Sequence, residues 1–367
     1  MPKNNRYYKK LRPFYTKEGD DDNTLIFESR FESGNLRRAV KIGEYEYNLI
    51  LKYDHLTTAY TQWFYFRIQN VKKFVTYKFN IVNLVKPESS YNQGMKPLFY
   101  SKKDQDVENG GSGYGWYRDG QNICYYQNQL KKKGGGFYYT LTFSVQFKHD
   151  DDEVFMAHCY PYTYTDCTEL LQRLCTPDCK DRIRKTIVCK TLAGNDCEMA
   201  IITNFSSRPE EIAIRRAIVI TSRVHPGESN ASYIVEGILN FLVSDDEVAK
   251  YLRNNFVFKI IPMLNPDGVI IGNYRTSLSG MDLNRQWVAP SMKQFPENCS
   301  TKMMMRKTLE SRDILFYCDI HGHSRCKNLF MYGCSNQRAD RLKERIFPLL
   351  FHKNSENFHF DCCNFVI

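Results

Sequence analysis

The sequence predicts an all-β sandwich or barrel followed by an α/β domain with a largely parallel or mixed sheet. Two observations predict this order. Residues 24–165 contain short aromatic and β-branched runs that alternate with period two and have no helical segment between them, which is typical of antiparallel sheets. From residue 166 onward, apolar strand-like runs alternate with helix-like segments, which is typical of a parallel or mixed sheet flanked by helices.

Composition and charge narrow the class of protein. A chain of 367 residues with 42% hydrophobic and 14% aromatic residues is long and apolar enough for two globular domains. We expect neither a secretory signal nor a membrane span, because the first 23 residues are polar and no apolar stretch reaches the length of a span. Thirteen irregularly spaced cysteines then predict reduced thiols in a cytosolic protein. The net charge of +10 is compatible with an acidic partner, but taken alone it is most simply explained by solubility. The basic run at 131–133 is most simply a hairpin tip.

The strands of the first domain follow from these alternating runs. The glycine-rich stretch 104–122 is expected to be a surface loop, because no apolar strand precedes it and no Gly-Lys-Ser/Thr follows. The expected strands are 24–31, 45–51, 62–68, 74–82, 138–147 and 154–162.

The second domain is read from longer apolar runs and helical periodicity. Its expected helices are 168–175, 229–244, a segment near 301–311, and 339–350. Its expected strands are the pair 186–194 and 197–205, then 216–224, 255–264, 313–322 and a short strand at 328–333.

Potential metal ligands follow two of these strands. His225 and Glu228 come directly after the strand 216–224, and His321 lies at the end of the strand 313–322. Because ligands gather at the carboxyl ends of parallel strands, we expect these side chains to meet. Each one alone also fits an ordinary turn or a half-buried histidine, and His323 stays open as an alternative to His321. Three protein ligands with a free fourth position are typical of catalytic zinc.

The polar stretch between these ligands carries a second group of candidates. Arg275, Asp282, Asn284 and Arg285 follow the Asn-Pro-Asp-Gly turn at 265–268. The planar guanidinium group matches a carboxylate with two hydrogen bonds, so the arginines favour recognition of a carboxylate. Asp282 is the kind of residue that orients a ligand histidine.

Four motifs carry a family resemblance: "HPGE", "NPDG", "GNYRTSLSGMDLNRQW" and "DIHGHS", in this order and spacing. Together they resemble the zinc carboxypeptidases, and more specifically the cytosolic carboxypeptidases, which remove glutamates from polyglutamylated tubulin and other acidic tails. The resemblance implies a basic and acidic tail at 1–23, a β-sandwich domain at 24–165, and a partial carboxypeptidase-like α/β domain at 166–367 whose mixed sheet is incomplete at the C-terminus.

The resemblance also implies roles for the candidate residues. His225, Glu228 and His321 would bind one Zn²⁺ per chain, and Asp282 would support His225. Arg275 would polarise the scissile carbonyl and stabilise the oxyanion, while two further residues would hold the terminal carboxylate of the substrate, namely Asn284 and Arg285. The implied protein is a metalloprotease that acts in the cytosol, including at microtubule-based structures. Its partners would be polyglutamylated tubulin or other glutamate-rich tails, with no nucleic acid and no membrane.

The chain departs from the family pattern in two places. Gln286 replaces the usual asparagine after the Asn-Arg pair, with little expected effect. The general-base glutamate of the family would lie beyond residue 367, and neither Glu344 nor Glu356 has a matching context, so we expect a C-terminally truncated form.

The departure leaves two functions open. One is a carboxypeptidase that removes C-terminal or side-chain glutamates, and the other is a catalytically incomplete, zinc-containing binding module for acidic tails. A zinc deacylase of the aspartoacylase type shares the His-x-x-Glu pair and the later histidine, but the "NPDG" motif and the leading β-domain disfavour it. A nucleic-acid binder is disfavoured because no aromatic stacking platform is evident.

Overall fold

The computed structural model describes residues 15–323, 326–334 and 342–365. The chain forms two compact units, Met1–Gly322 and His323–Ile367, and each is described by itself. Part of the predicted tail at 1–23 lies outside the described residues. The predicted helix at 339–350 also begins outside them. Within the described residues, no helix combines the length and the apolar character needed to cross a bilayer.

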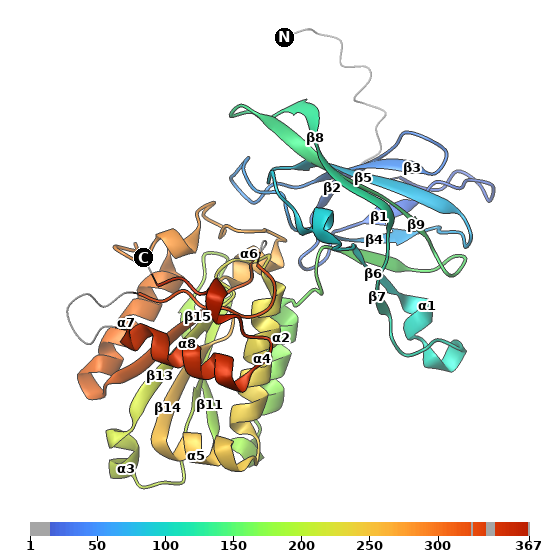
Figure 1. The fold of residues 1–367 in the computed structure, drawn as a ribbon. Helices are drawn as coiled ribbons and strands as arrows, with labels where there is room; N and C mark the ends of the chain where they lie inside the picture. The colour runs from blue at the N-terminus through green and yellow to red at the C-terminus, as the bar shows by residue number, and fades with distance from the viewer. Residues whose placement is uncertain (1–14, 324–325, 335–341, 366–367) are drawn as a thin grey trace. The chain divides into compact units, whose positions relative to one another are not determined.

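The N-terminal part of the first unit is a sandwich of two five-stranded sheets (Figure 1). One sheet has the order β1-β4-β10-β6-β7, with the bounds Ile26–Glu28, Tyr65–Gln69, Val154–Ala157, Leu98–Ser101 and Trp116–Arg118. The other has the order β2-β3-β5-β9-β8, with the bounds Leu36–Lys41, Glu46–Leu51, Thr76–Leu84, Phe137–Gln146 and Gln121–Lys131. Two separate sheets make this a sandwich rather than a barrel.

Alternation along the strands builds the sandwich core. Inward-facing residues of both sheets, among them Tyr47, Phe66, Phe79 and Phe143, are fully or almost fully buried and form one apolar cluster. Such aromatic side chains each bury a large area, which makes this cluster the main source of stability in the sandwich. The pairings are antiparallel except for β3 and β5, which run parallel.

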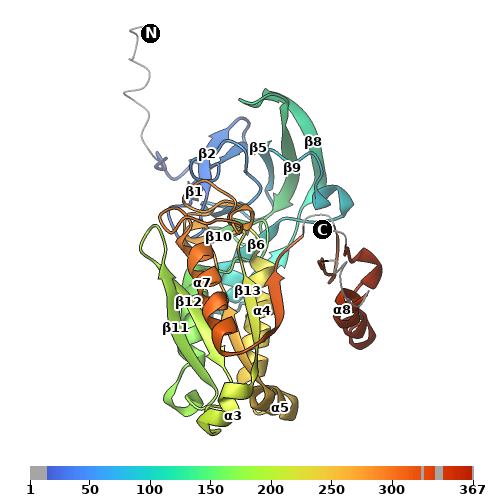
Figure 2. The ribbon, with the colours of Figure 1, turned by 90° about the vertical axis from the view of Figure 1, so that its left-hand side faces the viewer.

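Several elements of the sandwich differ from the sequence expectation. The chain at 36–41 and 121–131 forms edge strands β2 and β8, which alternation did not reveal because most of their residues are exposed. The expected loop 104–122 contains β7 and a short 3-10 helix, Val107–Asn109, after helix α1 (Lys102–Gln105). The basic run at 131–133 does lie at the tip of the long β8–β9 hairpin (Figure 2).

The rest of the first unit is an α/β domain with one mixed five-stranded sheet. Its order is β11-β12-β14-β13-β15, with the bounds Ile183–Lys190, Asp196–Ile202, Phe256–Ile261, Arg216–Ser222 and Ile314–Ile320. The pairs β13–β14 and β13–β15 are parallel, whereas β11–β12 and β12–β14 are antiparallel. The predicted mixed sheet is therefore confirmed.

Helices cover both faces of this sheet (Figure 1). The core on one face joins strand residues such as Ile202 and Ile260 to Leu171 and Leu239 of the helices. The core on the other face includes Met304. The helices are α2 (Tyr164–Leu174), α3 (Pro209–Ile214), α4 (Ser229–Val243), α5 (Glu247–Asn255), α6 (Pro266–Ile270), the 3-10 helix η5 (Leu283–Arg285) and α7 (Pro296–Ser311).

Helix α2 marks the beginning of the α/β domain. Its capping box, formed by Thr163 and Asp166, satisfies backbone N–H groups at the helix start. The predicted boundary at residues 165/166 falls inside the first turn of this helix, so we place the seam in the connection 158–163 between β10 and α2.

The second unit contains helix α8 (Lys343–Asn354) and the 3-10 helix η6 (Phe360–Cys362). The prediction of a strand at 328–333 is wrong. Only isolated bridges form there, Leu329 with Phe358 and Tyr332 with Asn364. Two isolated bridges do not make the continuous ladder that the apolar run suggested.

Candidate metal centre

The ends of two neighbouring parallel strands bring the predicted metal ligands together. Strands β13 and β15 pair in parallel with Ser222 opposite Ile320, so their carboxyl ends lie at the same edge of the sheet. His225 follows the first strand after two residues, and His321 follows the second strand directly. Glu228 is the residue that precedes helix α4. The structure therefore places the ends of these two strands, and the candidate ligands after them, at one edge of the sheet.

The chain turns sharply around His225, where it leaves strand β13. Arg223 has a positive φ of 55°, and its buried guanidinium group donates from Nε to the Pro226 carbonyl (2.9 Å) and from Nη1 to Ser232 Oγ (2.8 Å). A Cβ atom at position 227 would lie 2.5 Å from the ring of Tyr274, so only glycine fits there. The Pro-Gly pair therefore folds the chain back and lets His225 and Glu228 face each other.

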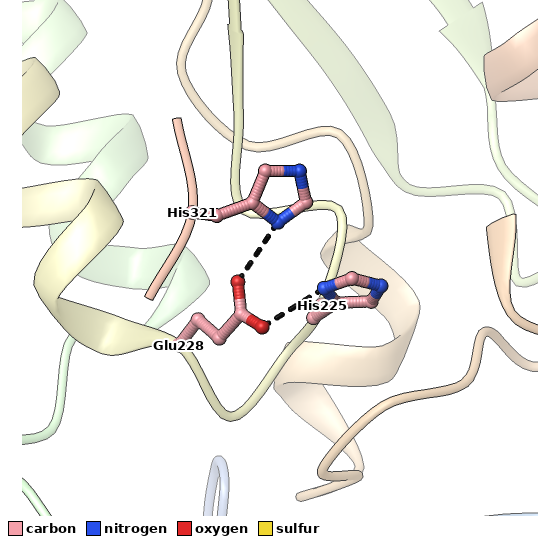
Figure 3. A group of neighbouring side chains, drawn as sticks. All are labelled: His225, Glu228 and His321. Carbon is pink, nitrogen blue, oxygen red and sulfur yellow. Dashed lines mark hydrogen bonds and ion pairs between the residues drawn. The ribbon is translucent and has the colours of Figure 1, made fainter. Parts of the chain in front are cut away.

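The three side chains form one compact donor set (Figure 3). Glu228 Oε1 lies 2.9 Å from His225 Nδ1, and Glu228 Oε2 lies 3.0 Å from His321 Nδ1. One donor atom from each residue lies within 4.8 Å of the other two. His225 is buried, whereas Glu228 and His321 are partly exposed, so the set is fixed on one side and reachable on the other.

A carboxylate backs each histidine on its far side. His225 Nε2 lies 3.1 Å from Asp282 Oδ1, and His321 Nε2 lies 2.8 Å from Asp319 Oδ2. A carboxylate in this position holds the proton on Nε2 and turns the lone pair of Nδ1 toward a metal. Sequence analysis missed Asp319, although its place two residues before His321 on an extended strand put both side chains on the same face.

The charges around the donor set favour the binding of a cation. Burial raises the pKa of Glu228, but the hydrogen bonds from His225 and His321 outweigh it and lower the pKa to about 2. Burial lowers the pKa of His321, but its bonds to Asp319 and Glu228 raise it to about 10. The same balance raises the pKa of His225 and lowers that of Asp282.

This chemistry fits zinc. Two imidazole nitrogens and one carboxylate oxygen, with both histidines backed by carboxylates, are the donor types that catalytic zinc takes from a protein. The three carboxylates at this edge also favour a divalent cation over the protons that otherwise bridge them.

The arginine-bearing loop reaches the same place through Asp282. Arg275 donates from Nε and Nη2 to Asp282 Oδ2 at 2.9 and 2.7 Å. Asp282 also accepts the backbone N–H of Asn284 and begins η5. Of the predicted set, Asp282 therefore contacts His225 directly, and Arg275 is linked to His225 through Asp282.

Two other predicted residues stand apart from the donor set. Asn284 Oδ1 accepts from Trp287 Nε1 at 2.8 Å, and Arg285 is an exposed side chain whose Nη1 donates to the Asn284 carbonyl. Both lie on η5 next to Asp282. His323 belongs to the second unit, where its Nδ1 accepts the backbone N–H of Cys326, and among the described residues it is not part of the donor set.

Comparisons with known proteins agree with this geometry. The family model described as zinc carboxypeptidase matches residues 169–359, which include every predicted site residue, and the model described as cytosolic carboxypeptidase N-terminal domain matches residues 27–109. Cytosolic carboxypeptidase 2 of Mus musculus is 51% identical over 355 residues, which are 96% of this chain and 41% of that protein. The Xenopus tropicalis protein of the same name is 47% identical over 350 residues, 94% of this chain and 36% of that protein.

The chain therefore spans less than half the length of these curated relatives. Solved structures share its fold. A metallo-carboxypeptidase from Burkholderia cenocepacia superposes with a TM-score of 0.71 at 22% identity, over 94% of this chain and 83% of that chain. A metallo-carboxypeptidase from Pseudomonas aeruginosa gives a TM-score of 0.63 at 22% identity, over 84% of this chain and 72% of that chain.

Proposed function

The chain belongs to the zinc carboxypeptidase family, and from this premise we propose that it removes C-terminal or side-chain glutamates from polyglutamylated proteins such as tubulin. One observation carries the proposal. The donor set of His225, Glu228 and His321 lies at the carboxyl edge of the sheet, and both of its histidines are backed by carboxylates.

The proposed reaction is hydrolysis of the terminal peptide bond. His225, Glu228 and His321 would hold one zinc ion, which supplies Lewis-acid polarisation of a carbonyl and lowers the pKa of water. Asp282 and Asp319 keep the two imidazoles in the orientation that this requires.

Arg275 is proposed as the group that stabilises negative charge on the scissile carbonyl oxygen. Its Nε and Nη2 are both engaged by Asp282, and among the described residues Nη1 has no hydrogen-bond partner. A guanidinium group fixed in this way can present its remaining N–H groups to an oxyanion without first losing rotational freedom.

Arg285 and Asn284 are proposed to hold the free terminal carboxylate of the substrate. The Arg285 guanidinium is exposed, and it can form two parallel hydrogen bonds to a carboxylate. A terminal glutamate carries two carboxylates, so a site with the two cations Arg275 and Arg285 would favour glutamate over an apolar terminal residue. The proposed place of action is the cytosol, including microtubule-based structures, and the similarity to cytosolic carboxypeptidases supports the cytosol.

Zinc content and turnover test this proposal in one preparation. The purified 367-residue chain is stripped of metal, reloaded with zinc, desalted, and incubated with a peptide that ends in several glutamates. We expect close to one zinc per folded chain and the release of free glutamate. His321→Ala should reduce the zinc content below about a tenth of an equivalent, since the loss of one of three ligands removes a large share of the binding free energy.

His323→Ala is the matched control and should keep both zinc and turnover. Loss of zinc in this variant, with zinc retained in His321→Ala, would contradict the ligand assignment. A zinc-loaded chain that binds the peptide without cutting it would replace the hydrolase by the alternative, a binding module for acidic tails. A folded chain that takes up no zinc would overturn both.

A further inference from the structure

A carboxylate of the sandwich domain holds the loop that carries Arg275. Asp54 lies between β3 and β4 and accepts hydrogen bonds from three successive backbone N–H groups of the α/β domain. They belong to Tyr274 (2.6 Å), Arg275 (2.7 Å) and Thr276 (2.9 Å). The Thr276 hydroxyl donates to the same carboxylate at 3.2 Å. All four residues of this contact belong to one compact unit, Met1–Gly322.

Neighbouring contacts keep both sides of this clamp in place. The backbone N–H of His55 donates to Asn273 Oδ1 at 3.0 Å, and Asn273 Nδ2 donates to the Thr276 carbonyl at 2.8 Å. On the other side, the backbone of Asp54 bonds to Tyr60 and Thr57. The carboxylate and the loop are thus each fixed by their own domain as well as by each other.

The burial of Asp54 makes the contact costly to break. Its relative exposure is 3%, and burial raises the pKa of its carboxyl group despite the N–H donors. Without the carboxylate, the buried N–H group of Thr276 and the partly buried N–H groups of Tyr274 and Arg275 would lose their acceptor, and an unsatisfied N–H group away from water is costly. Sequence analysis missed this residue, because Asp54 lies in a polar turn more than 200 residues away from its partners.

The clamped loop leads directly to the metal centre. Arg275 pairs through Nε and Nη2 with Asp282 Oδ2, and Asp282 Oδ1 bonds to His225. The ring of Tyr274 covers Gly227 in the ligand loop. A shift of the backbone at 274–276 would therefore move the guanidinium group and uncover the chain between two metal ligands.

We propose that Asp54 is a positioning residue for Arg275, so that the sandwich domain sets the geometry of a group at the active centre of the α/β domain. This inference rests on the proposed function, since it assigns Asp54 an effect on turnover through Arg275. Misplacement of a catalytic group by about 1 Å costs on the order of 100-fold in rate, so the effect is measurable.

Glu32 offers a matched control for Asp54. It is also a sandwich carboxylate that accepts two backbone N–H groups and one hydroxyl group of the α/β domain, from Tyr164 (2.7 Å) and from Thr165 (3.1 and 2.6 Å). Those donors lie at the start of α2, not on the Arg275 loop. Replacing either carboxylate by its amide removes the same chemistry at two different places.

Hydrogen exchange tests the clamp without any need for activity. We expect the amides of 274–276 to exchange at least about tenfold faster in Asp54→Asn, because local opening no longer breaks bonds to a carboxylate. Glu32→Gln should leave these amides protected. Thr276→Val, which removes only the hydroxyl bond, is the milder variant if Asp54→Asn does not fold, and it should speed exchange about two- to fivefold. Unchanged exchange in the folded variants would overturn the inference.

Kinetics test the link to Arg275. Per zinc-loaded molecule, kcat of Asp54→Asn should fall roughly 10- to 100-fold with little change in KM, while Glu32→Gln stays at the wild-type value. The double variant Asp54→Asn/Arg275→Ala should be no slower than Arg275→Ala alone, because both act through one guanidinium group. A full additional loss in the double variant would overturn the positioning role. A wild-type chain with no turnover would overturn the proposed function, and the exchange experiment would then decide the clamp by itself.

Discussion

The ligand loop at 223–228 and the arginine loop at 273–285 meet at the candidate metal centre, but they are held in different ways. The ligand loop is fixed from within the α/β domain, by the buried guanidinium group of Arg223 and by Asn265, whose Nδ2 donates to the Val224 carbonyl at 3.0 Å. The arginine loop takes three of its backbone hydrogen bonds from Asp54 of the sandwich. The difference indicates that the backbones of the two loops have different supports, although Asp282 of the arginine loop also backs His225. The proposed zinc binding and the proposed substrate activation should therefore respond differently to mutation.

The largest effect that separates the two loops is expected for Arg275→Ala. Removal of a group that stabilises the oxyanion typically costs 10²- to 10³-fold in kcat, and the zinc content should remain near one equivalent because none of the three donors is touched. Turnover and zinc are measured on the same sample. Arg208→Ala removes an exposed arginine paired with Glu211 on α3 and should change neither value. A loss of zinc in Arg275→Ala would show that the two supports are not separate.

In the ligand region, Asp319→Asn is expected to have a smaller effect, and the quantity that it lowers is zinc affinity. Without the carboxylate, His321 loses the partner that fixes its tautomer, and such changes cost roughly 10- to 100-fold in metal affinity. Competition with a chelator measures this affinity. Turnover at saturating zinc should fall less than in Arg275→Ala. The control is Asp245→Asn, which changes an exposed surface pair with Arg182. Equal zinc affinity in the two variants would show that Asp319 does not support metal binding by His321.

The smallest effect is expected at the point where the two loops touch. In Gly227→Ala the new Cβ would meet the Tyr274 ring at 2.5 Å, and such overpacking costs about 1–3 kcal/mol of the free energy of unfolding. Thermal denaturation measures this loss. Gly237→Ala, within helix α4 and with no atom within 4 Å of the new Cβ, should instead gain up to about 1 kcal/mol. If both variants melted alike, the contact between the loops would be looser than described.

Sequence patterns revealed those parts of the fold that depend on local periodicity. The strands β13 and β14, which are largely buried, and the partly exposed edge strand β15 were all predicted from continuous apolar runs in the sequence. The ends of β13 and β15 then placed His225 and His321 at one edge of the sheet. The exposed edge strands β2 and β8 were missed, since side chains in contact with water carry no alternating signal.

The candidate site was only partly predictable for a related reason. His225, Glu228 and Asp282 belong to motifs, but Asp54 gains its role from three backbone N–H groups, which have no side-chain signature in a sequence. Asp319 is an ordinary strand residue until the parallel pairing with β13 brings Thr221 to its Oδ1 and its own Oδ2 faces His321. Both carboxylates act through partners that only the tertiary structure supplies.

The clamp at Asp54 also bears on how modular this protein is. The connection at 158–163 is where a protein engineer would divide the chain to obtain the α/β domain alone. Such a cut would leave the amides of 274–276 and the amide group of Asn273 facing solvent without their partners from the sandwich. A domain exchange at this seam would therefore have to include the turn at 54–57 together with the sheet of the α/β domain. The segment that must be transferred as one piece is thus larger than the α/β domain alone.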